Sequence, residues 1–296
     1  MNAPAVLAAE RPQVRAVVPS DFALARAAVM ALYDELKAYP KPGLVSPIDS
    51  GAHADMDFTL MCRSADSLLD PFTSLAAAGR TGQSFEDGLQ PLGVAAERRM
   101  LAVTGGVNTH RGAIFSLGMI VAAVARTVER SSTGLSLESV RMTLMDEWGH
   151  ALAAHAASSG AAGSHGAAVR RDMGRDGARH EAARGFPSIF EIGVPAYRQA
   201  LKAGLDGNAA SIQTLFSLME AVDDTTVLYR GGLGAAVFVR QSAAAFLARG
   251  GCAREGWFEE AEHLHRAFIA RNLSPGGCAD LLAVTRFVIG CCERAP

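Results

Sequence analysis

The segment TGGVNTHRGAIFSLG, from Thr104 to Gly118, passes from a polar turn into an apolar run within a few positions. Gly105 and Gly106 can adopt a positive φ and so end one helix, and Asn108 or Thr109 can cap the next. The apolar residues that follow recur at helical spacing to the end of the segment and beyond it. The segment therefore predicts two helices joined by a short polar turn.

The same turn contains chemistry that a plain helix connection does not need. Free amide groups at a helix start form an anion site, and the guanidinium of Arg111 can add a cationic fork. A glycine stop followed by an asparagine cap would explain the glycines and the amide side chain, but it would not explain His110 and Arg111. Both interpretations stay open from the residues alone.

Helical periodicity also dominates the rest of the chain, and almost no segment alternates apolar and polar residues as a half-buried strand would. We therefore predict an all-α fold with a flexible tail over residues 1–20 and a single compact multi-helix catalytic domain over 21–296. Its site is expected in polar, Gly-rich loops between the helices. Ser20, Ser136 and Ser274 are the expected N-caps, and Pro71 is expected to bend or split one helix. The predicted helices are residues 20–39, 55–78, 84–104, 114–129, 137–157, 167–183, 188–203, 209–222, 235–248, 259–270 and 275–292.

The composition is typical of a soluble globular protein. The chain has 296 residues and a net charge of −2, so no basic surface for nucleic acid or anionic membrane is expected. No apolar run is expected to span a bilayer, and residues 1–20 lack the pattern of a signal peptide. The five cysteines include no CxxC pair, which favours reduced thiols and a cytoplasmic protein.

A second polar loop, PKPGLVSPIDSGAHADMDF at residues 40–58, combines Lys41 between two prolines with His53, Asp55 and Asp57 at every second position. Two carboxylates and an imidazole at this spacing can bind Mg²⁺ or supply a general base. An acidic first turn of a helix that starts near Asp55 would also explain the carboxylates, because they favour the helix dipole.

A third loop, VDDTTVLYRGG at residues 222–232, places Asp223 and Asp224 where a helix is expected to end. Carboxylates are unfavourable at that end of the dipole, so a metal ion or the nearby Arg230 would have to offset them. Gly231 and Gly232 add backbone amides beside that guanidinium.

A fourth loop, NLSPGGCAD at residues 272–280, has Ser274 at an expected N-cap and Pro275 at the first helical position. A cap does not explain Gly276 and Gly277, since glycine in a helix costs about 1 kcal/mol relative to alanine. Something is therefore expected to pack closely on this backbone. RHEAARGFPS at residues 179–188 is a weaker candidate than these four loops, because it fits a solvated charged helix face at least as well as a phosphate contact.

These loops, in this order, resemble the triphosphoribosyl-dephospho-CoA synthase family. The resemblance implies an enzyme that transfers the 5-triphosphoribosyl unit of ATP to the 2′-hydroxyl of 3′-dephospho-CoA and releases adenine. The product would pass to a phosphoribosyl-dephospho-CoA transferase that acts on the acyl carrier protein of malonate decarboxylase or citrate lyase. The Arg- and Ala-rich composition favours malonate decarboxylase. The matching segments, which lie between about residue 22 and 290, are PKPGLV, GAHADMDF, TGGVNTHRGAIFSLG, SHG, RHEAARGFPS, DDTTVLYRGG and NLSPGGCADLLA.

Such a reaction develops positive charge on the ribosyl carbon, so the enzyme must hold a triphosphate, assist adenine departure and deprotonate a hydroxyl. The resemblance implies Mg²⁺ bound by Asp55 or Asp57 and by Asp223 or Asp224. One of these carboxylates, or His53, would be the general base, and His110 would protonate or hydrogen-bond the leaving adenine. The expected substrate- and phosphate-binding residues are Lys41, Gly105, Gly106, Asn108, Thr109, Arg111, Arg230, Gly231, Gly232, Ser274, Gly276 and Gly277.

Two other function classes fit the same residues. An all-α, Mg²⁺-dependent hydrolase of nucleotides or diphosphates would use the acidic pairs with water as the nucleophile. A non-catalytic helical module would bind CoA-like ligands or the carrier protein without turnover. A homodimer is compatible with each of these classes.

Overall fold

Two apolar helices, α5 (Arg111–Arg130) and α13 (Gly276–Cys292), pack against each other at the centre of the molecule. The chain was analysed as a computed structural model that describes residues 19–130, 134–157 and 177–293, and no strand occurs in these ranges. The all-α prediction is confirmed. The other α-helices are α1 (Asp21–Lys37), α2 (Phe58–Ser67), α3 (Leu69–Arg80), α4 (Gln90–Val103), α6 (Leu137–Ala157), α8 (Ala178–Ala183), α9 (Val194–Lys202), α10 (Gly207–Ala221), α11 (Thr225–Ala248) and α12 (Trp257–Ile269).

Helix α5 is enclosed because its apolar residues occupy nearly every face. Leu117, Ile120 and Val124 are fully buried, as expected for a helix in the middle of a core rather than at its surface. Helix α3 crosses α5 at Gly79, where a Cβ atom would overlap the backbone of Ala122. The glycine therefore permits the close approach of these two backbones.

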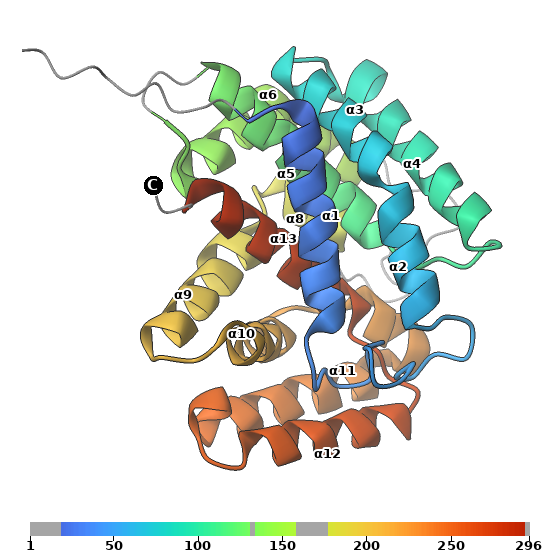
Figure 1. The fold of residues 1–296 in the computed structure, drawn as a ribbon, viewed down its shortest axis with the longest axis vertical. Coiled ribbons are helices and arrows are strands. Elements are labelled where there is room, and N and C mark those ends of the chain that lie inside the picture. Colours follow the sequence, from blue (N-terminus) through green and yellow to red (C-terminus); the bar gives the residue numbers. More distant parts are fainter. Residues whose placement is uncertain (1–18, 131–133, 158–176, 294–296) are drawn as a thin grey trace, which may run out of the picture.

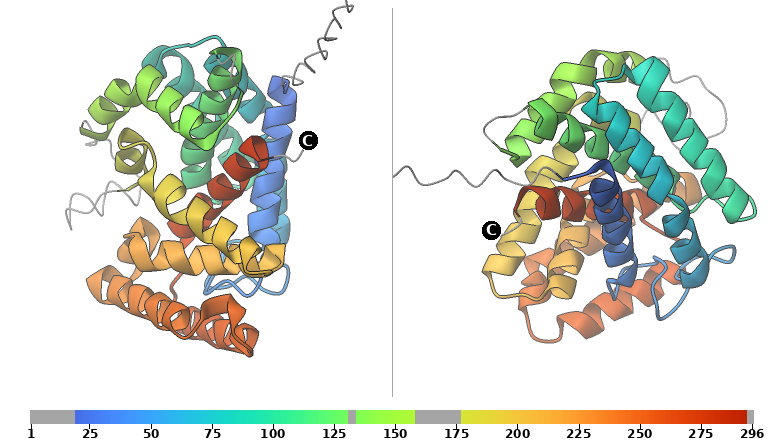
Figure 2. Two further views of the ribbon diagram at one scale, coloured as in Figure 1. Left: turned by 90° about the vertical axis from the view of Figure 1, so that its left-hand side faces the viewer. Right: turned by 45° about the horizontal axis from the view of Figure 1, so that its top comes forward.

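The remaining helices surround this centre. Helices α1, α3, α4 and α6 pack against α5, whereas α9 and α10 pack against α13 (Figure 1). Helices α11 and α12 form an outer layer at one end of the molecule, where α11 packs against α10 (Figure 2). The first turns of α5, α11 and α13 come together in the interior between these parts.

Several element boundaries confirm local signals in the sequence. Helix α6 spans the predicted residues, and the Oγ of Ser136 accepts a hydrogen bond from the amide of Ser139 at 3.1 Å. Ser20 caps α1 in the same way, through the amide of Ala23. The predicted helix over 55–78 is split, as expected, although the break falls at Leu68 between α2 and α3.

Other boundaries differ from the predictions. Helix α11 begins at Thr225, well before the predicted residue 235, because an acidic cap starts it; it is interrupted at Gly232, which has φ 67° and ψ −164°. The predicted helix over 188–203 begins with a π-helical turn, Ser188–Gly193, followed by α9. Of the helix predicted over 167–183, residues 167–176 and the SHG segment lie outside the described residues.

The prediction that Ser274 caps the last helix is wrong. Helix α13 begins at Gly276 with Pro275 in the N-cap position, and no side chain caps it from that position. The Oγ of Ser274 instead lies 2.9 Å from Nε2 of His53. A tertiary contact has therefore replaced the local one.

The expectation that no segment has the length and apolarity of a membrane span is too broad. Among the described residues, Arg111–Arg130 and Thr225–Ala253 are long and apolar enough by composition. The first is the core helix α5, and 72% of its apolar window is buried inside the protein. Core helices of soluble proteins commonly pass this test, so the two segments are weak evidence for a membrane protein.

Candidate active site

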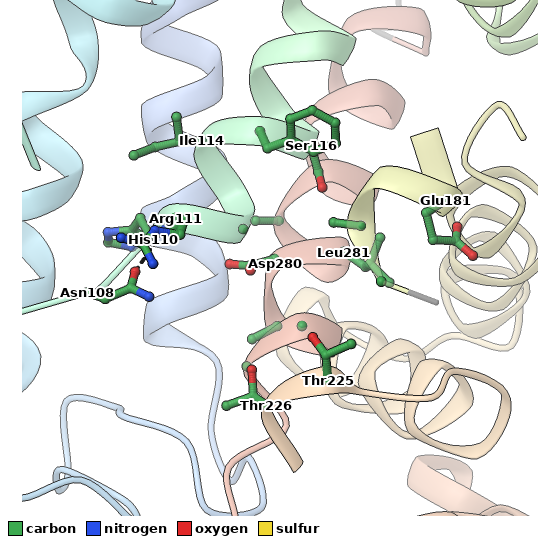
Figure 3. Close-up of a pocket in the computed structure, with 18 of the residues that line it drawn as sticks. Asn108, His110, Arg111, Ile114, Ser116, Glu181, Thr225, Thr226, Asp280 and Leu281 are labelled. Carbon is green, nitrogen blue, oxygen red and sulfur yellow. Dashed lines mark hydrogen bonds between the residues drawn. The ribbon is translucent and has the colours of Figure 1, made fainter. Parts of the chain in front are cut away.

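The predicted loops meet around one interior cavity of about 990 Å³, a size suited to a nucleotide-sized or larger ligand. Its walls come from the end of α1, the loop before α2, the turn between α4 and α5, α8, and the first turns of α11 and α13. Figure 3 shows His110 on one side, Glu181 of α8 on the opposite side, and Asp280 of α13 between them. The predicted site residues that line the cavity are His53, Asp55, Asn108, Thr109, His110, Arg111, Asp223, Asp224, Arg230, Ser274, Gly276 and Gly277.

His53 is fixed in one tautomer by its neighbours. Nη2 of Arg230 lies 3.0 Å from Nδ1 of His53, and because a guanidinium only donates, Nδ1 must accept. Nε2 therefore carries the hydrogen and donates to Oγ of Ser274. Burial and the charge of Arg230 lower the pKa of His53 to about 4. The imidazole is thus neutral, with both ring nitrogens engaged.

Arg230 joins two of the predicted loops. Besides His53, its guanidinium donates to the carbonyl of Ala52 at 2.8 Å and to Oδ1 of Asn272 at 3.1 Å. Most of its donors therefore hold the loop before α2 against the loop before α13. If Arg230 binds a phosphate as predicted, its guanidinium must share these protein contacts with the phosphate oxygens.

Lys41 is a buried ion-pair partner and does not line the cavity. Its ammonium donates to a carboxylate oxygen of Glu35 at 2.5 Å and to the carbonyl of the same residue at 2.7 Å, in the last turn of α1. Only 1% of the residue is exposed. Burial lowers the pKa of Lys41, whereas the carboxylate of Glu35 raises it. Glu35 itself reaches the cavity wall.

The glycines of the opening segment end α4. Gly105 and Gly106 have φ of 66° and 90°, and the amide of Gly106 donates to the carbonyl of Leu101, which is the pattern of a Schellman stop. Oδ1 of Asn108 accepts from the amide of Arg111 at 3.2 Å, so the asparagine caps the next helix. Neither glycine lines the cavity.

Arg111, the second predicted cation of this segment, forms an ion pair with Glu97 of α4. Both side chains line the cavity and are partly exposed. Because Glu97 lies in α4 and Arg111 begins α5, this ion pair holds the two helices together across the turn. A phosphate bound here would have to compete with that carboxylate.

His110 is 3% exposed and has an unused ring nitrogen. Its Nδ1 lies 2.8 Å from Oγ of Ser64, and that hydroxyl lies 2.6 Å from Oγ1 of Thr109. Its Nε2 is buried without a hydrogen-bond partner, and the residue lines the cavity. Burial and the charge of Lys41 lower the pKa of His110 to about 4, so the imidazole is neutral. A buried polar atom without a partner is costly, which indicates that a ligand completes this position.

Asp224 caps two helices at once. One carboxylate oxygen accepts from the amides of Thr226 and Val227 at the start of α11, at 2.8 and 3.3 Å, and the other accepts from the amide of Cys278 in α13 at 2.9 Å. The chain of Gly277 passes so close that a Cβ atom there would lie 3.1 Å from the carboxylate. This contact is the close packing that the glycine-containing first turn predicted.

The other acidic candidates lie apart. Asp223 pairs with Arg240 at 2.7 Å, and Asp57 caps α2 through the amide of Leu60 at 2.8 Å and does not line the cavity. Asp55 lies at the cavity wall, 3.7 Å from Nδ1 of His53. Among the described residues, no three His, Cys, Asp or Glu side chains converge as a metal site would require. Metal binding by these four carboxylates stays a prediction.

Gly231 and Gly232 lie in α11, where their lack of a side chain suits the local packing and backbone conformation. The first faces Leu273 at close range, and the second takes the positive φ that interrupts the helix. Neither lines the cavity. Their binding of phosphate also stays a prediction.

Two further arginines line the cavity, although the sequence alone would place them in solvent equally well. Arg179 and Arg184 belong to α8 and its C-terminal end, and neither guanidinium has an ion pair or hydrogen bond with another described residue. They contrast with Lys41, Arg111 and Arg230, whose charges are engaged by the protein. No local pattern in the sequence could reveal this difference, because it depends on which cations have partners in the fold.

Asp280 is the site residue that sequence reasoning missed. It lies in α13 and lines the cavity, where a Cβ atom on Gly112 would overlap its Oδ2. The amide of Ala113 donates to its carboxyl group. The start of α5 was predicted to bind an anion, and the acid found there is the protein's own. A glycine in the first turn of a helix, Gly112, was the available signal.

Comparisons with known proteins agree with this arrangement. Residues 21–295 match the model of the family described as ATP:dephospho-CoA triphosphoribosyl transferase. A relative from Acinetobacter calcoaceticus, named as a probable 2-(5″-triphosphoribosyl)-3′-dephosphocoenzyme-A synthase, is 39% identical over 88% of this chain and 87% of its own. Proteins of the same name from Azotobacter vinelandii and Stutzerimonas stutzeri are 40% and 39% identical, over 88% and 90% of both chains.

No solved structure matches this chain significantly. The family match covers nearly all of the chain, including every loop that contributes to the cavity. The curated relatives match over most of their own length as well. The chain therefore belongs to the ATP:dephospho-CoA triphosphoribosyl transferase family.

Proposed function

We propose that this chain transfers the 5-triphosphoribosyl group of ATP to the 2′-hydroxyl of 3′-dephospho-CoA and releases adenine. Membership of the family supports this reaction. The observation in the structure that supports it is one cavity lined by two guanidiniums, of Arg179 and Arg184, that have no partner among the described residues, and by a histidine nitrogen, Nε2 of His110, that has none either. A nucleoside triphosphate presents anionic charge at one end and a hydrogen-bonding base at the other.

The triphosphate is assigned to the α8 side. Arg179 and Arg184 can give it charge-assisted hydrogen bonds without first breaking an ion pair with a described residue. Arg111 and Arg230 are the next candidates, since they line the same cavity, although each is held by partners. Lys41 acts indirectly, because it is enclosed behind Glu35.

The adenine is assigned to the side of His110. With its pKa lowered to about 4, this imidazole is neutral at physiological pH, so Nε2 offers a hydrogen bond to the base and not a proton. Of the two roles that the resemblance implied for His110, hydrogen bonding therefore fits better than protonation. His53 has the same limitation as a proton acceptor, because both its nitrogens are engaged.

We propose that Mg²⁺ enters with the triphosphate of ATP. The described residues do not fit a site built by the protein alone, because Asp57 and Asp224 are committed to helix caps and Asp223 to Arg240. Asp55 is the predicted ligand that stays exposed at the cavity wall. Bound to ATP, the ion would neutralise part of the phosphate charge.

We further propose that the product supplies the carrier protein of malonate decarboxylase rather than that of citrate lyase. The Arg- and Ala-rich composition favours this branch. The product would pass to a phosphoribosyl-dephospho-CoA transferase, and a homodimer and a cytoplasmic location belong to the same proposal. Conversion of each purified apo-carrier by the coupled enzymes tests the branch.

Mass spectrometry of the purified protein with ATP, Mg²⁺ and dephospho-CoA tests the reaction. We expect adenine and a triphosphoribosyl adduct of dephospho-CoA in equal amounts. Release of phosphate or ribose phosphate without the adduct would identify a hydrolase instead. A ligand-induced rise in melting temperature with no turnover would identify a binding module.

A further inference from the structure

Asp280 is held at a fixed point of the cavity wall, between the two central helices. Its carboxyl group occupies the space that a side chain on Gly112 would need, and it receives the amide of Ala113. Figure 3 shows the carboxyl group pointing from α13 towards the segment that contains Asn108, His110 and Arg111. The side proposed for adenine is therefore the side that this acid faces.

The surroundings of Asp280 favour the protonated form of its carboxyl group. Among the described residues it has no ion-pair partner, and burial, Glu35 and Asp224 together raise its pKa well above the usual range. The amide of Ala113 opposes this change only in part. A raised pKa favours the protonated form that a general acid requires.

The proposed reaction needs a general acid, and no residue has yet been assigned to that role. Adenine is a poor leaving group as an anion, so cleavage of its bond to the ribose requires a proton donor. Four described histidines line the cavity, and the two to which the resemblance assigned chemistry, His53 and His110, are neutral with pKa values lowered to about 4. Asp280 is a half-buried acid that faces the same space.

We propose that Asp280 is the catalytic residue that protonates the departing adenine. The inference rests on the proposed transferase reaction. The C1′–N9 bond of ATP breaks with its electron pair moving to adenine, and the carboxyl proton of Asp280 moves to a ring nitrogen of the base. The 2′-oxygen of dephospho-CoA bonds to C1′, and the hydroxyl proton passes to the Asp280 carboxylate. Adenine leaves with one added proton, and the enzyme regains its starting state.

In this arrangement His110 positions the base and does not supply the proton. Its unpartnered Nε2 gives the purine a second hydrogen bond and so fixes the base against Asp280. Glu35 and its partner Lys41 lie behind the acid and the histidine, and their charges act on the pKa of each. The buried ion pair thus belongs to the electrostatic setting of the proposed proton donor.

The test compares Asp280→Asn with wild type on two substrates. Asparagine keeps the size of the side chain but has no acidic proton. We expect the variant to release adenine from ATP about 10²- to 10⁴-fold more slowly, the usual contribution of general acid catalysis. With 7-methyl-ATP, whose base is already positively charged and leaves without a proton donor, the deficit should shrink to within about tenfold. An equal deficit on both substrates, or full activity on ATP, would overturn the proposal.

A measurement on the wild type alone covers the case in which the variant does not fold. With ATP the rate should fall at high pH as Asp280 loses its proton, and with 7-methyl-ATP this decline should be absent. The described titratable groups near Asp280 are Glu35 of α1, Asp224 before α11, Cys278 of α13 and His110 before α5, and they should affect both substrates alike. Identical pH profiles would refute the role of Asp280. If wild type forms no adenine from either nucleotide, the proposed transferase function itself has failed.

Discussion

Replacing Asp224 by asparagine should destabilise the fold far more than the same change at its neighbour. The carboxylate accepts from three amides at the N-termini of two helices. An asparagine keeps one acceptor oxygen and turns an NH₂ group towards the remaining amide, so one side of the double cap is lost. The residue is only 3% exposed, so water cannot replace the lost acceptor.

The size of the effect follows from these contacts. A hydrogen bond to a charged group contributes about 1.5–3 kcal/mol. A negative charge at a helix N-terminus adds about 0.3–1 kcal/mol. We therefore expect Asp224→Asn to lower the free energy of unfolding by about 2–4 kcal/mol. At roughly 2–4 °C per kcal/mol, the melting temperature would fall by about 4–16 °C.

The assay is thermal unfolding followed by circular dichroism at 222 nm or by calorimetry. Asp223→Asn is the matched control, because Asp223 makes a partly exposed ion pair with Arg240, and such pairs contribute about 0–1 kcal/mol. If both variants melt within about 2 °C of wild type, the double cap does not hold these helices together. A loss of magnesium dependence without a change in melting would instead support Asp224 as a metal ligand.

Three further predictions follow from the charges of the site. Lys41→Met leaves a buried carboxylate without its partner and should lower the free energy of unfolding by about 3–5 kcal/mol in urea titrations; a loss below 1 kcal/mol would show that the ion pair is not buried in solution. Arg179→Ala and Arg184→Ala should each raise the KM for ATP by about tenfold or more with a smaller change in kcat, as for a lost hydrogen bond to a charged group; unchanged KM values would place the triphosphate elsewhere. His53 and His110 have a folded-state pKa of about 4 against an ordinary 6.5, so the unfolded chain binds protons first as the pH falls. The contribution of these two histidines to stability should therefore be full above about pH 6.5 and be lost towards pH 4, whereas that of Asp280, whose folded-state pKa is raised, runs in the opposite direction. The difference in urea midpoint between wild type and a His53→Gln/His110→Gln variant isolates the histidine contribution, and a difference that does not change between pH 6.5 and pH 4 would contradict their burial as neutral groups.

The helices were predictable wherever the signal is local. The serine before α6 caps it as the sequence indicates, and the turn after α4 ends in a glycine stop and an asparagine cap. Both motifs require only residues within five positions of each other, so no knowledge of the fold is needed. The regular apolar spacing of α5 likewise predicts a helix without its neighbours.

The errors occur where a distant residue decides the local structure. Ser274 has the sequence context of a cap, yet its hydroxyl binds His53, which lies 221 positions earlier. The start of α11 was placed too late because Asp224, taken as the end of one helix, caps the next one and α13 together. Side chains that can cap and can also reach across the fold are ambiguous until the fold is known.

The site could be predicted only in part, because the sequence does not show which lysine and arginine side chains already have acceptors in the protein. Sequence reasoning named Lys41, Arg111 and Arg230 as phosphate ligands from the polar loops that contain them. Arg111 and Arg230 line the cavity, whereas Lys41 does not. The sequence could not show that each of these charges already has an acceptor in the protein. The reverse holds for Arg179 and Arg184, whose helix looks like a solvated surface in sequence and faces the cavity in the fold.

The start of α5 shows why the anion site of the opening segment has to be assigned differently. A helix N-terminus attracts negative charge, and the first amides after the turn would suit a phosphate. In the fold, however, the amide of His110 donates to the sulfur of Met100, that of Arg111 to Asn108, and that of Ala113 to Asp280. A phosphate placed here would have to displace these partners and approach an acid. The first turn of α5 therefore holds Asp280 at the cavity. Arg179 and Arg184, which have no partner among the described residues, are for this reason the better candidates for the proposed triphosphate contacts.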